Sequence, residues 1–333
     1  RATIPGAERA LAHNPNLHFL LFGRTREIES ELGHYPALRA VSTLHHADVV
    51  IAAHEKPSIA LRQGRDSSMR KAIEAVSNNT AHCIVSSGNT GALMATAKIV
   101  LKTMPGIHRP AIASVFPTVK DPTVVLDLGA NIECDAEMLV QFAVLGAVYA
   151  RTFKNCETPT VGLLNVGSEE MKGHDELRQA AKVLSSIKFP GRFHGFIEGN
   201  DIPMGTTDVV VTDGFTGNVA LKVAEGVGKM AGTYVRQAFR SSWIATLGAM
   251  FAYRSLQNLK KKFDPRLHNG GMFLGLNGIC VKSHGGSDFV GVSNAILRAA
   301  ELVAMDFNRR VAAEMDSIMN QESFLTSLTT EVA

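Results

Sequence analysis

The segment AHCIVSSGNTGALMATA, residues 81–97, contains a short β-type run, a polar loop and a helix-forming stretch in immediate succession. The loop residues are Ser86, Ser87, Gly88, Asn89 and Thr90. At a helix start, unpaired backbone N–H groups and the positive end of the helix dipole favour an anion such as phosphate. Ser and Asn are also ordinary helix caps, so this segment alone leaves both interpretations open.

Similar polar loops follow three other expected strands, at residues 166–173, 213–218 and 282–288. The alternation of strands and helices predicts an α/β fold, with a mostly parallel sheet covered by helices on both faces in an α/β/α sandwich. In such folds ligands bind beyond the carboxyl ends of the strands, so we expect all four loops to gather at one edge of the sheet. Four such loops favour an anionic ligand.

The pattern also predicts individual elements and residues. Val49–Ile51 is an expected strand, and Val219–Arg240 and Asn294–Met315 are expected to form one helix each. Asp127 ends another expected strand, where a buried carboxylate is costly unless it is hydrogen-bonded or functional. The candidate phosphate- or substrate-binding residues are Ser86, Ser87, Gly88, Asn89, Thr90, Asp127, Asn131, Asn165, Gly167, Ser168, Asp213, Asn218, Lys282 and Ser283.

Composition narrows the class of protein. The chain has 333 residues, 45% of them apolar, and no apolar run of about 18 residues that would cross a membrane. A net charge of +3 is too small to indicate a nucleic-acid partner. The four cysteines are far apart and predict reduced thiols in a cytoplasmic protein, and no Cys/His spacing indicates a metal. We therefore expect a soluble protein without metal.

Three well-known nucleotide and nucleophile motifs are missing or misplaced. The match Gly226-x-Gly228-x-x-Ala231 lies inside an expected helix rather than after a strand. Gly228-Lys229 is followed by Met230, so it is not a P-loop, and no Gly-x-Ser-x-Gly elbow occurs. Phosphate as a free ion or substrate remains, and no cofactor is expected.

Several segments together resemble one known family. These are HEKPSIALRQGRDSSM, SSGNTGALMA, VLDLGANIECDAEMLVQFAVLGAVYA, GLLNVGSEEMKG, EGNDI, VVVTDGFTGNVALK and GICVKSHGGSD. They resemble the phosphate acyltransferase family of bacterial phospholipid synthesis over nearly the whole chain. The resemblance implies a fold like that of isopropylmalate dehydrogenase and phosphotransacetylase. The length of 333 residues predicts one large α/β unit or two interleaved subdomains over residues 1–333. The resemblance places the family's first strand and its loop upstream of residue 1.

The resemblance implies a reaction and its partners. The family transfers a long-chain fatty acyl group from acyl-[acyl carrier protein] to inorganic phosphate, and a downstream glycerol-3-phosphate acyltransferase uses the acyl phosphate. The site must stabilise an oxyanion and release a thiolate. Lys172 matches a lysine implicated in this family, and its place near a helix start is disfavoured by the helix dipole, so stability does not explain it. His284 is the candidate for proton transfer or phosphate binding.

Residues 241–268 are expected to form a protruding amphipathic tip. Its apolar face consists of Trp243, Leu247, Met250 and Phe251, with Ile244 beside them. The basic run Lys260–Lys262 follows, and an apolar face next to cations is typical of a helix at an anionic membrane surface. A dimer interface or core helix would show the same pattern. The resemblance implies both a homodimer and peripheral association with the inner face of the membrane.

Two alternatives of other classes remain open. A coenzyme A-dependent phosphate acyltransferase would share much of the site but should lack the apolar tip. A non-catalytic scaffold that recruits partners to the membrane would keep Trp243, Leu247 and Phe251 but would not need Lys172. A dehydrogenase with a similar sheet would need a nicotinamide and a metal-binding carboxylate cluster, and neither signal is present in the sequence.

Overall fold

The computed structural model describes residues 2–154, 156–262, 266 and 270–321. Its helices are α1 Thr3–His13, α2 Thr25–Leu32, α3 Pro36–Ala40, α4 Pro57–Gln63, α5 Ser68–Ser77, α6 Thr90–Val100, α7 Ala136–Phe153, α8 Asp175–Ser186, α9 Asp201–Met204, α10 Gly214–Arg240, α11 Trp243–Phe251, α12 Tyr253–Lys262, α13 Phe289–Ala304 and α14 Phe307–Met319. Its strands are β1 Phe19–Gly23, β2 Ser42–His46, β3 Cys83–Ser86, β4 Ala111–Phe116, β5 Thr123–Leu126, β6 Thr160–Leu164, β7 Arg192–Ile197, β8 Val209–Val211, β9 Gly271–Leu274 and β10 Ile279–Lys282.

The main sheet has the strand order β3-β10-β9-β4-β5-β8-β6-β7. The pairs β3/β10, β5/β8, β8/β6 and β6/β7 are parallel. The pairs β10/β9, β9/β4 and β4/β5 are antiparallel. The expected α/β fold with a mostly parallel sheet is confirmed, and two strands that the sequence pattern did not predict make the sheet mixed.

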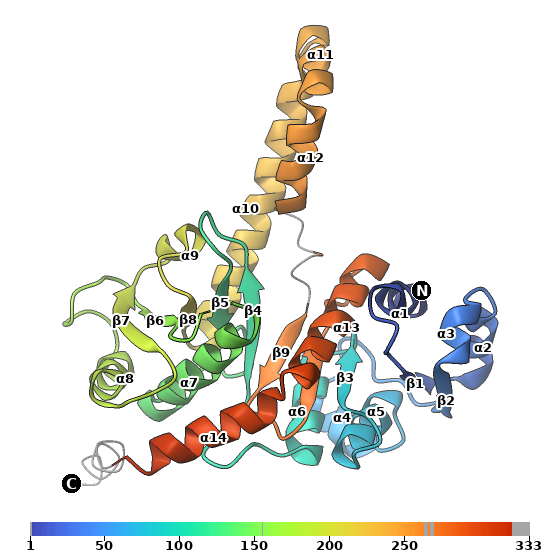
Figure 1. Cartoon of the computed structure of the whole chain (residues 1–333), viewed down its shortest axis with the longest axis horizontal. Helices are drawn as coiled ribbons and strands as arrows, with labels where there is room; N and C mark the ends of the chain where they lie inside the picture. Colours follow the sequence, from blue (N-terminus) through green and yellow to red (C-terminus); the bar gives the residue numbers. More distant parts are fainter. Residues whose placement is uncertain (1, 155, 263–265, 267–269, 322–333) are drawn as a thin grey trace.

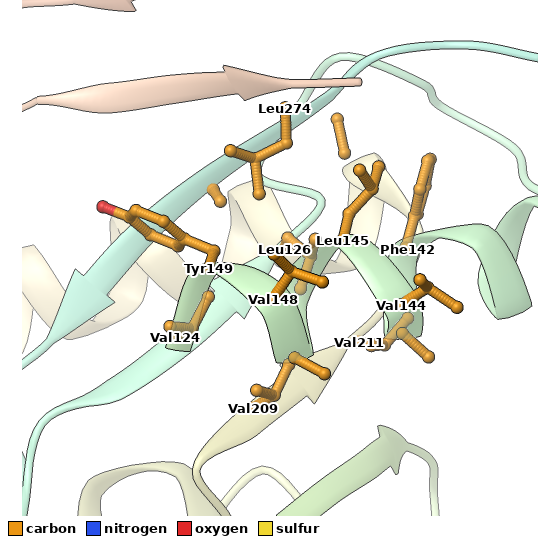
Figure 2. Close-up of a cluster of buried hydrophobic side chains, with 14 of the residues drawn as sticks. Val124, Leu126, Phe142, Val144, Leu145, Val148, Tyr149, Val209, Val211 and Leu274 are labelled. Carbon is orange, nitrogen blue, oxygen red and sulfur yellow. The ribbon is translucent and has the colours of Figure 1, made fainter. Parts of the chain in front are cut away.

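Helices cover both faces of the sheet, and successive side chains along a strand point to opposite faces. Val124 and Leu126 of β5 belong to the core cluster under α7, whereas Val125 between them faces the cluster under α5 and α6. Strands buried on both faces are typical of α/β folds and explain the near-continuous apolar runs. Figure 2 shows the α7 side, where Phe142 and Tyr149 lie among the side chains of β5, β8 and β9.

The close packing of α7 depends on a glycine. A Cβ atom at Gly146 would lie 2.5 Å from Val209 Cγ1 and 2.9 Å from Leu126 Cδ2. Only a residue without a side chain therefore lets the helix backbone approach β5 and β8 this closely. The helix is apolar on nearly every side, as expected for a helix that is buried between the sheet and α14.

The expected strand at Val49–Ile51 is wrong. Val49 makes only an isolated bridge to Ser67, and the strand lies earlier, at Ser42–His46, where it pairs in parallel with β1. Val50 is exposed, so this apolar run is not a buried strand. β1 and β2 form a separate two-stranded sheet with α1, α2 and α3 around it (Figure 1).

Two helix predictions had wrong boundaries. The expected helix at Asn294–Met315 is two helices, α13 and α14, separated at Asp306, whose φ of +51° belongs to the left-handed region. α10 begins at Gly214 rather than Val219, because the Asp213 side chain caps it by accepting from Thr216 N.

Helices α10, α11 and α12 project away from the sheet as a long arm (Figure 1). α11 lies at its far end, within the segment 241–268 that the sequence predicts to form the tip. Residues 263–265 and 267–269 of that expected segment lie outside the described residues, as do the side chains of Lys260–Lys262. Among the helices described, none has the length and apolar character that crossing a bilayer requires.

Candidate active site

The directions of the strands divide the expected loops into two groups. Between β10 and β5 the sheet reverses direction three times, so these two strands end at opposite edges. The first loop cluster, residues 86–90 and 282–288, follows β3 and β10. The second loop cluster, residues 127–131, 165–173 and 213–218, follows β5, β6 and β8. The expectation that all four polar loops share one sheet edge is therefore wrong.

In the first loop cluster, Asn89 acts as a structural cap. Its Oδ1 accepts from Ala92 N at 3.0 Å, and its Nδ2 donates to the carbonyls of Ala53 and Glu55 at 3.0 and 2.8 Å. Ser86 Oγ accepts from Gly88 N and so shapes the turn before α6. The capping interpretation of Asn89 is confirmed, and Ser87 and Thr90 lie beside it at the start of the helix.

The loop after β10 lies directly beside this helix start. Ser283 is fully buried, and its backbone N donates to Ser86 O at 2.9 Å. The exposed His284 ring accepts from Gly286 N through Nδ1 at 3.1 Å. Burial lowers the pKa of Lys282 to about 8, and its Nζ donates to the Ser283 carbonyl. The first loop cluster thus combines a helix N-terminus, a lysine and a histidine.

Asp127 holds the second loop cluster together. Its carboxylate is fully buried and accepts five hydrogen bonds, which are from Ile112 N, Gly129 N, Ala130 N, Asn131 N and Asn131 Nδ2. Burial raises the pKa of Asp127, and the hydrogen bonds from Ala130, Ile112 and Asn131 oppose that rise. Because it is enclosed, Asp127 shapes the loop rather than reaching a ligand in solvent.

The start of α10 packs onto this loop. Gly214 N donates to Asn131 O at 2.7 Å, and a Cβ atom at Gly217 would lie only 1.9 Å from Asp127 O. Asn131 is itself buried and donates through Nδ2 to Pro110 O at 2.9 Å. The exposed Asn218 follows one residue after Gly217, so its side chain is available at the surface of this cluster.

The loop that carries Lys172 is fixed from two sides. Asn165 Nδ2 donates to Lys172 O at 3.0 Å, and Asn165 Oδ1 accepts from Val166 N at 2.8 Å. Arg178 Nη1 donates to Met171 O and Gly173 O at 3.3 and 3.0 Å. The Lys172 residue itself is exposed, so a free cation is presented on an anchored backbone. Gly167 and Ser168 lie in the same loop.

Two hollows border the second loop cluster. The larger, of about 820 Å³, is lined by His108, Arg109, Ala130, Asn131, Ile132, Glu133, Cys134, Asp135, Met138 and Glu176. The smaller, of about 330 Å³, is lined by Ile132, Glu133, Cys134, Leu139, His174, Glu176, Leu177, Asp213 and Phe215. Burial raises the pKa of the Cys134 thiol to about 12, so it is no thiolate nucleophile at neutral pH.

Sequence reasoning missed several residues of this surface. Arg178 and Glu176 lie on α8, and Phe215 lies in the first turn of α10. Their positions in the sequence could have indicated them, because α8 and α10 begin directly after the polar loops. The first turn of such a helix lies at the same sheet edge as the loop before it. In the part of the chain that the structure describes, no group of three or more His, Cys, Asp or Glu side chains could hold a metal ion.

Solved structures place the fold in a known class. A phosphotransacetylase from Streptococcus pyogenes superposes with a TM-score of 0.64 at 16% identity, covering 91% of each chain. The EutD phosphotransacetylase from Staphylococcus aureus gives 0.55 at 14% identity, covering 91% of this chain and 99% of that one. The chain is therefore an α/β protein with the phosphotransacetylase-like fold.

Sequence relatives identify the family within that class. A family model described as "Fatty acid synthesis protein" matches residues 1–310. The chain is 55% identical over 312 residues to the phosphate acyltransferase of Rhodospirillum centenum, covering 94% of this chain and 88% of that protein. It is 48% identical over 308 residues to that of Caulobacter vibrioides, covering 92% and 86%. The chain belongs to the phosphate acyltransferase family and is an acyltransferase of lipid synthesis.

The anchored Lys172 loop leads to a testable prediction about Gly173. This residue has a φ of +84°, and a Cβ atom on it would lie 2.1 Å from Asn165 Oδ1. We expect Gly173→Ala to break the Asn165 clamp and to lower the free energy of unfolding by about 1–3 kcal/mol. Urea unfolding measures this loss, and trypsin cleavage after Lys172 should become faster.

Gly199→Ala is the matched control, because a Cβ atom there meets nothing within 4 Å. Its unfolding curve and its cleavage pattern should match those of the unmodified protein. An unchanged cleavage rate in Gly173→Ala would show that the Asn165 clamp does not hold the loop.

Proposed function

We propose that this chain transfers a long-chain fatty acyl group from acyl-[acyl carrier protein] to inorganic phosphate. A phosphate oxygen attacks the thioester carbonyl, the C–S bond breaks, and the carrier thiolate leaves and takes up a proton. The products are acyl phosphate and free carrier protein, and a membrane glycerol-3-phosphate acyltransferase would consume the former. The main support is the exposed Lys172 on a backbone fixed by Asn165 and Arg178, in a member of the phosphate acyltransferase family.

The two loop clusters offer complementary groups for this reaction. In the proposal, Lys172 stabilises the oxyanion that forms at the thioester carbonyl. The helix start at residues 86–90 and Lys282 hold phosphate, and His284 supplies the proton to the leaving thiolate. In the proposal, Asp213 and the exposed Asn218 position the donor's pantetheine arm, whereas the buried Asn131 shapes the loop beside them.

The twist of the sheet supports combining the two clusters into one site. β10 and β8 are four strand steps apart. Each step rotates a strand by about 20–25°, so the total is roughly 80–100°. The carboxyl ends of β10 and β8, which would point in opposite directions in a flat sheet, are then roughly 80–100° apart, and the proposal has the donor span both clusters.

The reaction is tested by release of free carrier protein from palmitoyl-[acyl carrier protein], with and without inorganic phosphate. We expect release to require phosphate, and Lys172→Ala to lower its rate at least about 100-fold, because an oxyanion contact is lost. Lys182→Ala on the exposed side of α8 is the matched control and should retain full activity.

Each other outcome rejects the proposal in a specific way. Release without phosphate would indicate a thioesterase. Equal use of palmitoyl-coenzyme A would favour the coenzyme A-dependent alternative, and no release at all would favour the scaffold. Full activity in Lys172→Ala would remove this lysine from the chemistry.

We also propose that the chain forms a homodimer through α10. One stripe of this helix, Val219, Val223, Val227, Met230 and Tyr234, is exposed along its length. The spacing of four, four, three and four residues places all five side chains on one helical face. A helix with such a face is stable in water when a partner helix covers it. A second copy of this chain presents the same stripe.

Val223→Asp tests this dimer, because it places a charge in the middle of the stripe. We expect the variant to sediment as a monomer while the unmodified protein sediments as a dimer. Val235→Asp is the control, since Val235 is exposed on another face of the same helix. A monomeric unmodified protein, or a dimer that survives Val223→Asp, would contradict the proposed interface.

The far end of the arm is proposed to contact a membrane surface at the cytoplasmic side. In α11 the side chains of Trp243, Ile244, Leu247, Met250 and Phe251 are all exposed, and Phe251 is 93% exposed. The exposed Arg236, Arg240 and Arg254 lie on the neighbouring helices, where they would face anionic lipid headgroups. The division into two interleaved subdomains and the upstream first strand stay predictions.

The membrane contact can be measured by tryptophan fluorescence, because Trp243 is the chain's single tryptophan. Anionic phospholipid vesicles should shift its fluorescence to shorter wavelength as the indole enters the interface. We expect Phe251→Asp to weaken vesicle binding at least about tenfold without affecting stability, since the side chain is exposed. Val119→Asp, exposed on the β4–β5 loop, is the control. An unshifted spectrum would argue against membrane contact.

A further inference from the structure

The smaller hollow of the second loop cluster, called here the Phe215 hollow, has apolar walls together with a comparable share of polar lining. Ile132, Leu139, Leu177 and Phe215 form these walls, and its volume of about 330 Å³ is within the range of ligand sites. They come from the loop after β5, from α7, from α8 and from the first turn of α10. Four elements therefore each contribute an apolar side chain to one recess at this sheet edge.

The apolar residues at its mouth are exposed without a role in the core. Ile132 is 74% exposed and Phe215 is 64% exposed, although both lie in loops or helix starts that are otherwise polar. Met171, in the neighbouring loop, is 88% exposed. Large apolar side chains that gather at one exposed place commonly mark a binding surface.

The hollow is tied to the Lys172 loop by the chain itself. His174 and Glu176 line it and follow Lys172 by two and four residues. Arg178, one turn further along α8, holds the carbonyls of Met171 and Gly173. Whatever occupies the hollow therefore lies beside the anchored segment that presents Lys172.

The charge of the rim selects the kind of occupant. Glu133, Glu176 and Asp213 are carboxylates, and His174 is the single basic side chain among the lining residues. An anionic phosphate group, a nucleotide tail or an acidic protein surface would be repelled here. A neutral aliphatic chain carries no charge for this rim to repel and can contact the apolar part of the lining.

We propose that the Phe215 hollow binds the fatty acyl chain of the donor, with Ile132 and Phe215 as the chain-contacting residues. This inference rests on the proposed acyl transfer and assigns the acyl subsite of that reaction. The hollow then sets the preference for chain length, because each additional buried methylene gains contact with these walls.

The test compares kcat/KM for palmitoyl- and butyryl-[acyl carrier protein] in phosphate-dependent release. We expect Phe215→Ala and Ile132→Ala each to lower the palmitoyl value by about tenfold and the butyryl value by less than about twofold. Both side chains are exposed, so the variants should fold normally, as unfolding curves will check. Val119→Ala, exposed at the opposite sheet edge, is the matched control.

The remaining outcomes overturn the inference. An unchanged ratio of palmitoyl to butyryl values in both variants would show that the chain lies elsewhere, while leaving the proposed reaction intact. Equal losses for both donors together with monomers in sedimentation would make the hollow a subunit contact. If the unmodified protein releases no carrier with phosphate, the reaction itself fails and the inference falls with it.

Discussion

The carboxylate of Asp127 accepts five hydrogen bonds while it is completely enclosed, and much of the second loop cluster depends on it. An ion buried this way is stable only when N–H donors replace its water. Here they come from the start of β4 and from the loop after β5. The same loop receives the first turn of α10, so one carboxylate links the sheet, the loop and the arm.

Asn165, directly after β6, has a comparable role in the loop that carries Lys172. Its amide bonds to the chain on both sides of the loop, at Val166 and Lys172, and Gly173 leaves room for it. Arg178 holds the loop from the helix that follows. The Asn165 and Arg178 side chains thus hold the backbone of the loop on which the exposed Lys172 stands. A site of this kind is preorganised by its surroundings.

The arm, unlike the loops, has exposed apolar side chains rather than a closed set of hydrogen bonds. Beyond its first turns α10 has little of the sheet to pack against, and its apolar stripe and the apolar end at α11 both remain exposed. The cost of that exposure is recovered when other surfaces cover it. A second copy along the shaft and a lipid surface at the far end would cover different parts, so both contacts are compatible on one arm.

The sequence by itself determined most of the elements and the family. Period-2 and period-3.6 patterns, glycines and capping residues are local signals, so the helices α7 and α8, the cap at Asn89 and the loop around Lys172 were predictable. The resemblance to the phosphate acyltransferases rested on several separate segments. It was confirmed by relatives that are about half identical over most of the chain.

Only the tertiary structure decided where these pieces lie. Pattern does not encode strand direction, so the reversals at β4 and β9 and the resulting separation of the two loop clusters were not predictable. The buried Asp127 carboxylate also has one distant partner, the backbone N of Ile112, and that contact follows from packing alone. The Phe215 hollow likewise exists because three segments that are distant in sequence converge, namely residues 132–139, 174–177 and 213–215, and no local pattern contains that convergence.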